Sequence, residues 1–470
     1  MYNPQYKSII ILLGVMLLSG CSASLEPQDS GIAAPSLWNR LTGAAPAIKK
    51  DLPLVESPEA EVDHLWWTRF GDATLDALVT EALANNKTLQ IARARVEEAR
   101  AGRNETRARL FPEINVVAGA RRNNLGYTTN NKAVSIGEVD VEATWELDLF
   151  GRNKARVSEA SAFLQSVEAS RQAVRVALLA EVARNYFDLR NYEHQLRVTR
   201  QNLETQKKTQ ELVEAQLQGA LAGDFDVQRA GAQVSTTEAL IPTLQTAYDA
   251  TLNRLNVLLG YPPGSRDSLL KSAEKLKPLE HHILIAAPAK VLAARPDVRA
   301  AERRFAASIS AKAAARAELF PNISLTALFG AQSSTPFSST PWGLGVSLVQ
   351  PILNFGRIEA QIDAADARQR QAFLSYQQTV LEALEDMENA LSGYLNETKR
   401  NASLTTEVRQ NRKAADLAMQ QYQNGYTGLL DVLVAVRDLL DSESSLAASD
   451  ASLRNDLVNI YTAAGGGWRL

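Results

Sequence analysis

The chain has 470 residues, of which 45% are hydrophobic and 22% are charged, and its 50 basic and 53 acidic residues leave a net charge of −3. A near-neutral chain without a long basic block argues against nucleic acid as a partner. After the first 20 residues no apolar run reaches the length of a membrane-spanning helix, so any membrane crossing must be made by β-strands.

The N-terminal residues predict export from the cytoplasm. Lys7 precedes the apolar run "IIILLGVMLL" at residues 9–18, which is too short to span a membrane and is typical of a secretory signal. The run ends in "LSGC", which resembles the lipobox of bacterial lipoproteins. This resemblance implies that residues 1–20 are a signal peptide and that Cys21 carries a covalent lipid. Ser22, in place of aspartate, then implies release to the outer membrane. Cys21 is the only cysteine, so an intramolecular disulfide is impossible.

The stretch "GEVDVEATWELDLFG" at residues 137–151 alternates strictly between apolar and polar side chains. A period of two predicts a β-strand, with Glu138, Asp140 and Glu142 on one face. In a soluble sheet the apolar face would cover a core. In a transmembrane barrel it would meet lipid, and the acids would face a water-filled lumen. The stretch alone leaves both interpretations open.

The chain contains two copies of one plan. "LFPEINV" at residues 110–116 recurs as "LFPNISL" at 319–325, 209 residues later, and the FGR at 150–152 recurs at 355–357, 205 residues later. Each copy is predicted to run strand, polar loop, strand, very long helix, turn, helix. The loops are "RRNNLGYTTNNKAVS" in the first copy and "AQSSTPFSST" in the second. Four strands are too few to close a barrel, so the membrane interpretation requires several chains.

The predicted boundaries follow from this repeat. Residues 21–65 form a lipid-anchored N-terminal segment, residues 66–290 the first repeat and residues 291–470 the second. The first repeat has a helix, a strand pair at about 112–150, a helical hairpin at about 151–260 and a linker. The second has a helix, a strand pair at about 321–354, a helical hairpin at about 356–464 and a C-terminal tail.

Very long helices are predicted in both copies. No Pro or Gly occurs from Arg152 to Gln218, and only Gly393 interrupts the stretch from Arg357 to Asn424. Each run would be about 100 Å long as a helix. In the first run apolar residues recur at coiled-coil spacing, and Pro242 is expected to kink the return helix. Helices of this length indicate the wall of a tube or a stalk.

Side chains that could support catalysis or metal binding are scattered. His64, His194, His281 and His282 do not suggest a metal cluster, and the glycines near Gly343 lie in a strand pattern instead of preceding a helix. No Ser, His and Asp constellation is evident in the sequence. We therefore predict no enzymatic activity, no metal, and no cofactor apart from the lipid on Cys21.

Several motifs, in order along the chain, resemble the outer membrane efflux protein family of TolC and OprM type ducts, in particular its lipoprotein branch. They are "WWTRFGDATLDALVTEALANN" from residue 66, "ELDLFGR", "ARPDVRAAERR" from residue 294, "ILNFGR" and "YTAAGGG" from residue 461. The resemblance implies an α+β membrane protein. Three chains each give four strands to one twelve-stranded transmembrane β-barrel, and the helices continue as a coiled-coil periplasmic tunnel. Glu138, Asp140 and Glu142 would then line the lumen, with Trp145 facing outward.

The resemblance also implies a gate at the periplasmic tips of the helical hairpins. The second tip reads "YQNGYTGLLDVL" and the first "GALAGDFDV". Asp431 and Asp226 are the equivalent acids, and the gate would include Tyr422 and Thr427, with bonds such as Tyr422 to Asp226 between neighbouring hairpins. The alternative for Asp431 is the N-cap of a helix, because Asp is favoured at helix starts. The tip turns are assigned to Gly219, Ala220, Gly223, Gly425 and Gly428.

Three positions depart from the family pattern at the tips. Val434 replaces an expected second acid, Thr427 replaces a basic residue, and Ala220 occupies a glycine position, with Gly219 one place early. These changes affect the charge and bonding of the gate.

The resemblance implies a passive exit duct for drugs or other small molecules. Its partners would be two further copies of the chain, a periplasmic membrane-fusion adaptor, an inner-membrane resistance-nodulation-division pump and outer membrane lipid. The alternatives are a duct for metal ions or secreted proteins, and a lipid-anchored periplasmic coiled-coil scaffold. The absence of Met or His clusters in the strands disfavours copper or silver as cargo.

Overall fold

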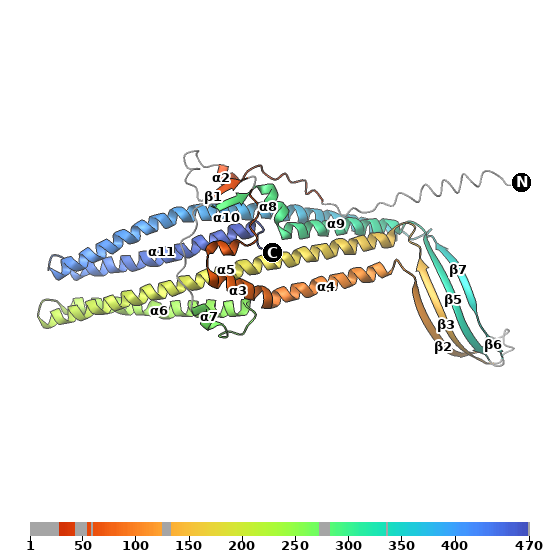
Figure 1. Cartoon of the computed structure of the whole chain (residues 1–470), viewed down its shortest axis with the longest axis horizontal. Helices are drawn as coiled ribbons and strands as arrows, with labels where there is room; N and C mark the ends of the chain where they lie inside the picture. The colour runs from red at the N-terminus through yellow and green to blue at the C-terminus, as the bar shows by residue number, and fades with distance from the viewer. Residues whose placement is uncertain are drawn as a thin grey trace. The chain divides into compact units, whose positions relative to one another are not determined.

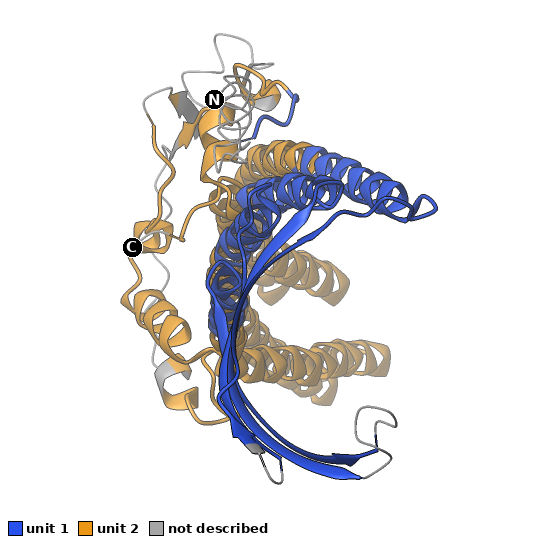
Figure 2. Ribbon diagram, turned by 90° about the vertical axis from the view of Figure 1, so that its right-hand side faces the viewer, with its two compact units in different colours: residues 1–32, 93–170, 297–379 blue, residues 33–92, 171–296, 380–470 orange. Residues whose placement is uncertain are grey.

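The computed structural model describes residues 28–42, 54–57, 60–124, 133–271, 283–334 and 337–468 (Figure 1). The predicted signal peptide, Cys21, His281 and His282 lie outside these ranges. The chain divides into two compact units (Figure 2). Unit 1 comprises residues 1–32, 93–170 and 297–379, and unit 2 comprises residues 33–92, 171–296 and 380–470.

Unit 1 contains an antiparallel sheet in the order β2, β3, β5, β7, with the short strand β6 also paired to β5 (Figure 1). Its strands are β2 (Glu113–Asn123), β3 (Val134–Glu146), β5 (Asn322–Ser334), β6 (Phe337–Ser339) and β7 (Trp342–Val349). The first repeat supplies β2 and β3, and the second repeat supplies the others. The strands β2 and β7 therefore form the two edges of the sheet.

The pairing register places the predicted apolar positions of all four long strands on one face. Val141 lies opposite Val116 on one side and Phe329 on the other, and Phe329 lies opposite Trp342. Because side chains alternate along each strand, the same rows carry the other apolar positions of the pattern. These are Ile114, Ala118, Val139, Ala143, Trp145, Ile323, Leu325, Ala327, Leu344, Val346 and Leu348.

The polar loop predicted for the second hairpin is wrong in its extent. Residues 331–334 of "AQSSTPFSST" continue β5, and residues 337–339 form β6. Gln332 pairs with Ser339 in the same register in which Phe329 pairs with Trp342. The strand is interrupted between β6 and β7 near Pro341, which has no N–H to donate. Ser and Thr side chains are compatible with a paired strand, so polarity alone did not indicate a loop here.

The long helices have equal lengths in the two repeats. The helices α5 (Arg152–Gln218) and α10 (Arg357–Gln423) each have 67 residues, and α6 (Asp224–Leu258) and α11 (Leu429–Ala463) each have 35. The helix α6 is continuous across Pro242. The helices α4 (Lys87–Ala108) and α9 (Pro296–Ala317) precede β2 and β5. The two-fold repeat and the α+β class predicted from the sequence are confirmed.

The core of unit 2 is aromatic and aliphatic. Trp66 in the 3-10 helix η1 (Trp66–Phe70) is fully buried and stacks on Tyr461 of α11, with ring centroids 5.6 Å apart. The carboxylate of Asp72 accepts hydrogen bonds from Thr74 N and from the buried Tyr186 hydroxyl. Asp72 thus caps α3 (Ala73–Asn85) and ties it to α5.

A second, smaller sheet in unit 2 is absent from the sequence-based prediction. The strands β1 (Leu54–Ser57) and β4 (Ile283–Ala286) pair in parallel. Neither of their four-residue sequences, LVES and ILIA, alternates between apolar and polar residues, so neither shows the period of two that predicts a strand. Three short helices complete the unit, α2 (Asn39–Thr42), α7 (Asp267–Lys271) and α8 (Pro288–Ala294).

The motifs "RPD" and "GGG" meet in unit 2. The Arg295 guanidinium donates to the Ala463 carbonyl oxygen at 3.0 Å and to the Asp386 carboxylate at 2.9 Å. Gly465 has a φ of +78°, and a Cβ there would lie 3.0 Å from Arg295 Cα. The glycine run thus ends α11 and lets the chain approach Arg295 closely.

None of the helices in the described parts of the chain has an apolar stretch long enough to cross a membrane.

Gly466→Ala should destabilise the fold, because a Cβ at Gly466 would lie 2.4 Å from the Asp63 carbonyl oxygen. Overpacking of this kind costs about 1–3 kcal/mol, so the unfolding temperature measured by circular dichroism in detergent should fall. Gly102→Ala is the control, because no atom lies within 4 Å of a Cβ there and α4 should gain up to about 1 kcal/mol. Equal unfolding temperatures for the two variants would contradict this packing.

Candidate functional site

The apolar face of the unit 1 sheet is exposed over its whole width. Trp342 and Leu344 on the edge strand β7 are 75% and 81% exposed, and Val116 on the opposite edge strand β2 is 71% exposed. A continuous apolar surface of this kind marks contact with lipid or with another protein. A soluble sheet would bury it.

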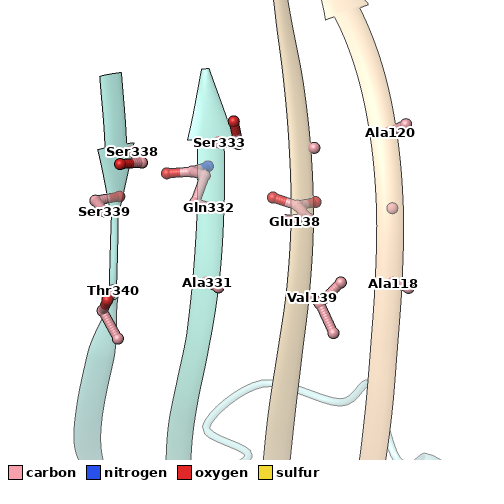
Figure 3. A pocket seen from close by; sticks show the side chains of 12 residues that line it. Ala118, Ala120, Glu138, Val139, Ala331, Gln332, Ser333, Ser338, Ser339 and Thr340 are labelled. Atoms are coloured by element: carbon pink, nitrogen blue, oxygen red, sulfur yellow. The ribbon is translucent and has the colours of Figure 1, made fainter. Parts of the chain in front are cut away.

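The acids predicted to line a lumen lie on the opposite face of β3. Glu138 is paired in register with Gly119 and Gln332, and it accepts a hydrogen bond from Arg121 at 2.7 Å. Figure 3 shows Glu138 and Gln332 on neighbouring strands. Of the 12 residues lining the shallow hollow of about 740 Å³ in this view, Glu138 is the one with an ionisable side chain. The hollow therefore has no catalytic constellation.

Asp140 and Glu142 follow Glu138 along the same face. Asp140 lies opposite Gly330, and a Cβ at Gly330 would lie 1.7 Å from Asp140 Oδ1. The missing side chain on β5 makes room for the carboxylate. Glu142 is exposed. The structure thus brings the three predicted acids together on one polar face, separate from the apolar one.

The two hairpin tips in unit 2 have the same backbone design. Leu221 N donates to Gln216 O at 2.8 Å, and Tyr426 N donates to Gln421 O at 2.8 Å, so each long helix ends in a Schellman motif. The left-handed residue of the motif is Gly425 in the second tip, with φ +78°, and Ala220 in the first, with φ +57°. Ala220 thus occupies the glycine position, as the comparison with the family pattern indicated.

Both predicted gate acids lie in the first turn of a returning helix. Gly223 and Gly428 are the N-caps of α6 and α11. Asp226 accepts a hydrogen bond from Gly223 N at 3.4 Å, and Asp431 accepts one from the Thr427 hydroxyl. The positive end of the helix dipole stabilises both carboxylates. Thr427, predicted at the gate, is therefore a direct partner of Asp431.

Tyr422 lies between the two tips of one chain. Its hydroxyl donates to Gln216 Oε1 at 2.5 Å, and no hydrogen bond joins it to Asp226 within the described chain. Burial and the nearby Asp226 carboxylate raise the pKa of the Tyr422 hydroxyl, which keeps it protonated as a donor. The partner Gln216 was not predicted from the sequence, because the contact depends on how the two hairpins pack.

A small apolar cluster holds the tips together. Val213, Ala230, Leu429 and Leu433 are buried against one another, with Tyr422 packed at the side.

Three large side chains in the turns of the tips are the most exposed of the apolar residues there. Leu221, Phe225 and Tyr426 are 82%, 72% and 84% exposed. The sequence analysis did not single them out, although apolar residues inside Gly- and Asp-rich turns are a signal for a binding surface.

The N-terminal segment contacts the helices of unit 1. Gln28 N donates to Glu302 Oε1 at 2.6 Å, and the Tyr376 hydroxyl donates to Gln28 O at 3.1 Å. Gln377 Nε2 donates to Ser30 O at 2.9 Å. These bonds fix residues 28–30 on α9 and α10, close in sequence to Cys21, which lies beyond the described part of the chain.

Comparisons with known proteins agree with this geometry. The model of the family "Outer membrane efflux protein" matches residues 78–261 and 287–466. The chain belongs to the outer membrane efflux protein family.

Two relatives and one solved structure extend over nearly the whole chain. The chain is 30% identical to the pyoverdine export outer membrane protein OpmQ of Pseudomonas aeruginosa, over 98% of this chain and 97% of OpmQ. It is 29% identical to the cation efflux system protein CusC of Escherichia coli, over 97% of each. The structure of the outer-membrane channel OprN matches 95% of this chain and 99% of its own, with a TM-score of 0.86 and 31% identity.

These findings identify the compartment and the class of function. The protein is an efflux channel of the bacterial outer membrane, and it is not an enzyme. Among the described residues, no group of three or more His, Cys, Asp or Glu side chains could hold a metal ion.

Ala220→Gly should stabilise the first hairpin tip, because alanine at a positive φ is strained by about 1–2 kcal/mol and glycine is not. We expect amide hydrogen exchange of residues 215–226 to slow several-fold. Gly425→Ala is the matched variant at the second tip and should accelerate exchange there. Unchanged exchange in both variants would show that the left-handed residues do not limit opening of the tips.

Proposed function

We propose that the protein is the outer membrane exit duct of a tripartite efflux pump, and that it releases drugs or other small organic molecules without chemical change. The observation that carries this proposal is the sheet, which has four long strands and the short strand β6, with one exposed apolar face, one acid-bearing face and two open edges. Lipid cannot hydrogen-bond an open strand edge, so the sheet must be completed by other chains.

The oligomer we propose is a homotrimer. Three copies would give a closed transmembrane barrel of about twelve strands, with the apolar face toward lipid and Glu138, Asp140 and Glu142 toward water. The long helices would line a periplasmic tunnel below it. OpmQ, by its name, exports pyoverdine, which supports a small organic molecule as the cargo.

The hairpin tips are the proposed gate and adaptor site. Leu221, Phe225 and Tyr426 offer exposed apolar contacts for the tips of a periplasmic membrane-fusion adaptor, which would connect the duct to an inner-membrane pump of the resistance-nodulation-division class. Binding there would act on the Thr427–Asp431 bond and on the Asp226 turn, because Tyr426 and Phe225 directly precede Thr427 and Asp226 in the chain. The resting gate is proposed to be closed by these elements around the threefold axis.

Cys21 is proposed as the lipid attachment site. Residues 28–30 dock on α9 and α10, and Gln28 is seven positions after the cysteine, a reach of at most about 25 Å. The lipid would supplement the membrane anchoring that the sheet itself provides.

Single-channel conductance in planar bilayers tests the duct and the gate together. The unsubstituted trimer should pass small currents. Asp431→Ala and Asp226→Ala should increase them several-fold, because each removes a first-turn interaction that contributes about 1 kcal/mol to the order of the tip. Asp249→Ala, an exposed acid on α6 outside the tips, should leave the current unchanged.

Two outcomes would contradict different parts of this account. If both tip variants pass the same current as the unsubstituted channel, the proposal that the tips form the gate is contradicted, and the proposal of a duct is not. Absence of current in every variant would contradict the duct.

The variant Cys21→Ala distinguishes the proposed duct from the alternative of a scaffold that is attached to the membrane by lipid alone. The variant should stay in the membrane pellet after alkaline extraction, because its strands would be held by the barrel. A scaffold attached by lipid alone would move to the supernatant. An immunoblot of the pellet and supernatant fractions, with the unsubstituted chain as control, shows where the variant is found.

A further inference from the structure

An arginine comes one helical turn before the exposed phenylalanine that leads into the sheet in each repeat. Arg107 on α4 comes four residues before Phe111, and Arg316 on α9 comes four residues before Phe320. The residue three positions after each arginine donates its backbone N–H to the arginine carbonyl oxygen, at 3.1 Å in the first repeat and 3.2 Å in the second. Both helices therefore end in the same turn and present the same arginine–phenylalanine step.

Both arginine–phenylalanine steps lie on the surface of unit 1. Arg107 and Arg316 are exposed, and Phe111 and Phe320 are 61% and 51% exposed. Within the described part of the chain neither arginine forms an ion pair or donates a hydrogen bond from its side chain. Each guanidinium group can therefore bind a partner outside the chain.

The N-terminal segment identifies the outer face of α9. Gln28 N donates to Glu302 Oε1 at 2.6 Å, and Figure 2 shows residues 28–32 on the convex side of the arc formed by the sheet and helices of unit 1. Arg316 follows Glu302 by 14 residues, which is nearly four full turns. The two side chains therefore leave the same, outer face of the helix.

The opposite face of α9 borders a hollow. Ala311 follows Glu302 by nine residues, or two and a half turns, and lines this hollow together with Gln361 and Arg368 of α10. At the start of α10, Arg357 donates to Gln361 Oε1 at 3.3 Å. The exposed arginines Arg357 and Arg368 therefore belong to the side away from the arginine–phenylalanine steps.

The surroundings of the two arginines have an excess of positive charge. Lys312 lies one turn before Arg316 and forms an ion pair with Asp366 of α10, so one carboxylate stands beside two cations. By the offsets of the repeat, the equivalent of Lys312 in the first repeat is Arg103, and the equivalent of Asp366 is Ser161. Two cations thus recur there without an acid at that position.

The arginines lie just beyond the end of the apolar face of the sheet. Ile114 and Ile323 are the first apolar positions of β2 and β5, and each phenylalanine stands three residues earlier, at most about 10 Å away. Arg107 and Arg316 lie about 6 Å further along their helices. The headgroup layer on each side of a bilayer is about 5–8 Å thick, and long basic side chains can extend toward it.

We propose that Arg107 and Arg316 bind the phosphate groups of anionic phospholipids in the periplasmic leaflet of the outer membrane, with Phe111 and Phe320 at the boundary of the hydrocarbon layer. The inference rests on the proposed function, because it requires the apolar face of the sheet to lie in lipid. A guanidinium group can donate two hydrogen bonds to one phosphate, and aromatic residues flank the apolar band of transmembrane barrels. Each chain then holds two headgroups, which fix the depth of the sheet in the membrane.

Two observations favour membrane lipid over a protein partner. The arginine–phenylalanine step stands at the same distance from the sheet in both repeats, as a flat membrane surface requires. Gln28 docks at the level of Glu302, about 21 Å along α9 from Arg316. The seven positions from Gln28 back to Cys21 reach at most about 25 Å, so a lipid on Cys21 can enter the membrane at the level of Arg316.

Spin-labelled lipids test this proposal with the full-length protein in phosphatidylcholine vesicles. Electron paramagnetic resonance distinguishes lipids held at the protein surface from freely moving lipids, and it compares anionic phosphatidylglycerol with neutral phosphatidylcholine. The unsubstituted protein should hold phosphatidylglycerol about twofold more strongly, averaged over all its lipid contacts, because a basic residue at an anionic surface contributes about fivefold at its own site. In the variant with Arg107→Gln and Arg316→Gln this ratio should fall close to one.

Two further variants show whether the position and the charge of these side chains matter. Arg357→Gln with Arg368→Gln removes the same charge from the hollow side of α10 and should leave the ratio unchanged. Arg107→Lys with Arg316→Lys keeps the charge and should retain most of the preference. All variants should elute as the same trimer as the unsubstituted chain, which shows that they fold.

The outcomes distinguish this inference from the proposed function. Loss of the preference in the Arg107 and Arg316 glutamine variant alone supports the headgroup sites. Equal binding of both lipids by the unsubstituted protein, an unchanged ratio in that variant, or an equal fall in the Arg357 and Arg368 variant overturns the sites and leaves the duct in place. If the unsubstituted protein holds neither lipid at its surface, the sheet is not in the membrane and both proposals are contradicted.

Discussion

The structure depends on one constraint, which is that a backbone N–H or C=O group in lipid must find its hydrogen-bond partner within the protein. The sheet of unit 1 meets this constraint along β3 and β5, which are paired on both sides, and leaves it unmet along β2 and β7. Its exposed apolar face excludes a solution in which one chain stays alone in water.

The internal repeat lets one chain supply several paired strands and the helices attached to them. Two copies of one plan give four long strands and two helical hairpins of equal length. The same helix-ending motif closes both hairpins, even though Ala220 must take the left-handed conformation that Gly425 adopts without strain. Each returning helix then carries an acid in its first turn, and the helix dipole stabilises the charge of this acid, so the proposed gate is built on an ordinary helix start.

Much of this architecture was predictable because its patterns are long and regular. The alternation around Val139 and Glu138 predicted a strand with two unlike faces, and the glycines at 151 and 356 marked the starts of α5 and α10. The resemblance to the family, and not a pattern of this kind, placed Asp226, Asp431 and the tip turns at equivalent positions. Cys21 stays a prediction.

What sequence reasoning missed depends on tertiary contacts or on segments too short for a pattern. The four-residue strands β1 and β4 find each other across the whole first repeat. Tyr422 donates to Gln216 because the two hairpins pack together, and Arg295 binds the end of α11 across a separation of 168 residues. The serine-rich segment after Gly330 is a strand because β5 and β6 pair with each other. Its polar sequence predicted a loop, because the pairing cannot be recognised from the sequence.

The most direct test of this account asks which face of β3 meets lipid. Nitroxide labels on single cysteines at Glu138, Val139, Val141 and Glu142, in liposomes, can be probed with oxygen, which concentrates in lipid, and with a water-soluble nickel chelate. The account predicts that oxygen reaches the labels at Val139 and Val141, and that the chelate reaches those at Glu138 and Glu142. Equal access of the chelate to all four positions would contradict a sheet that separates lipid from a water-filled lumen.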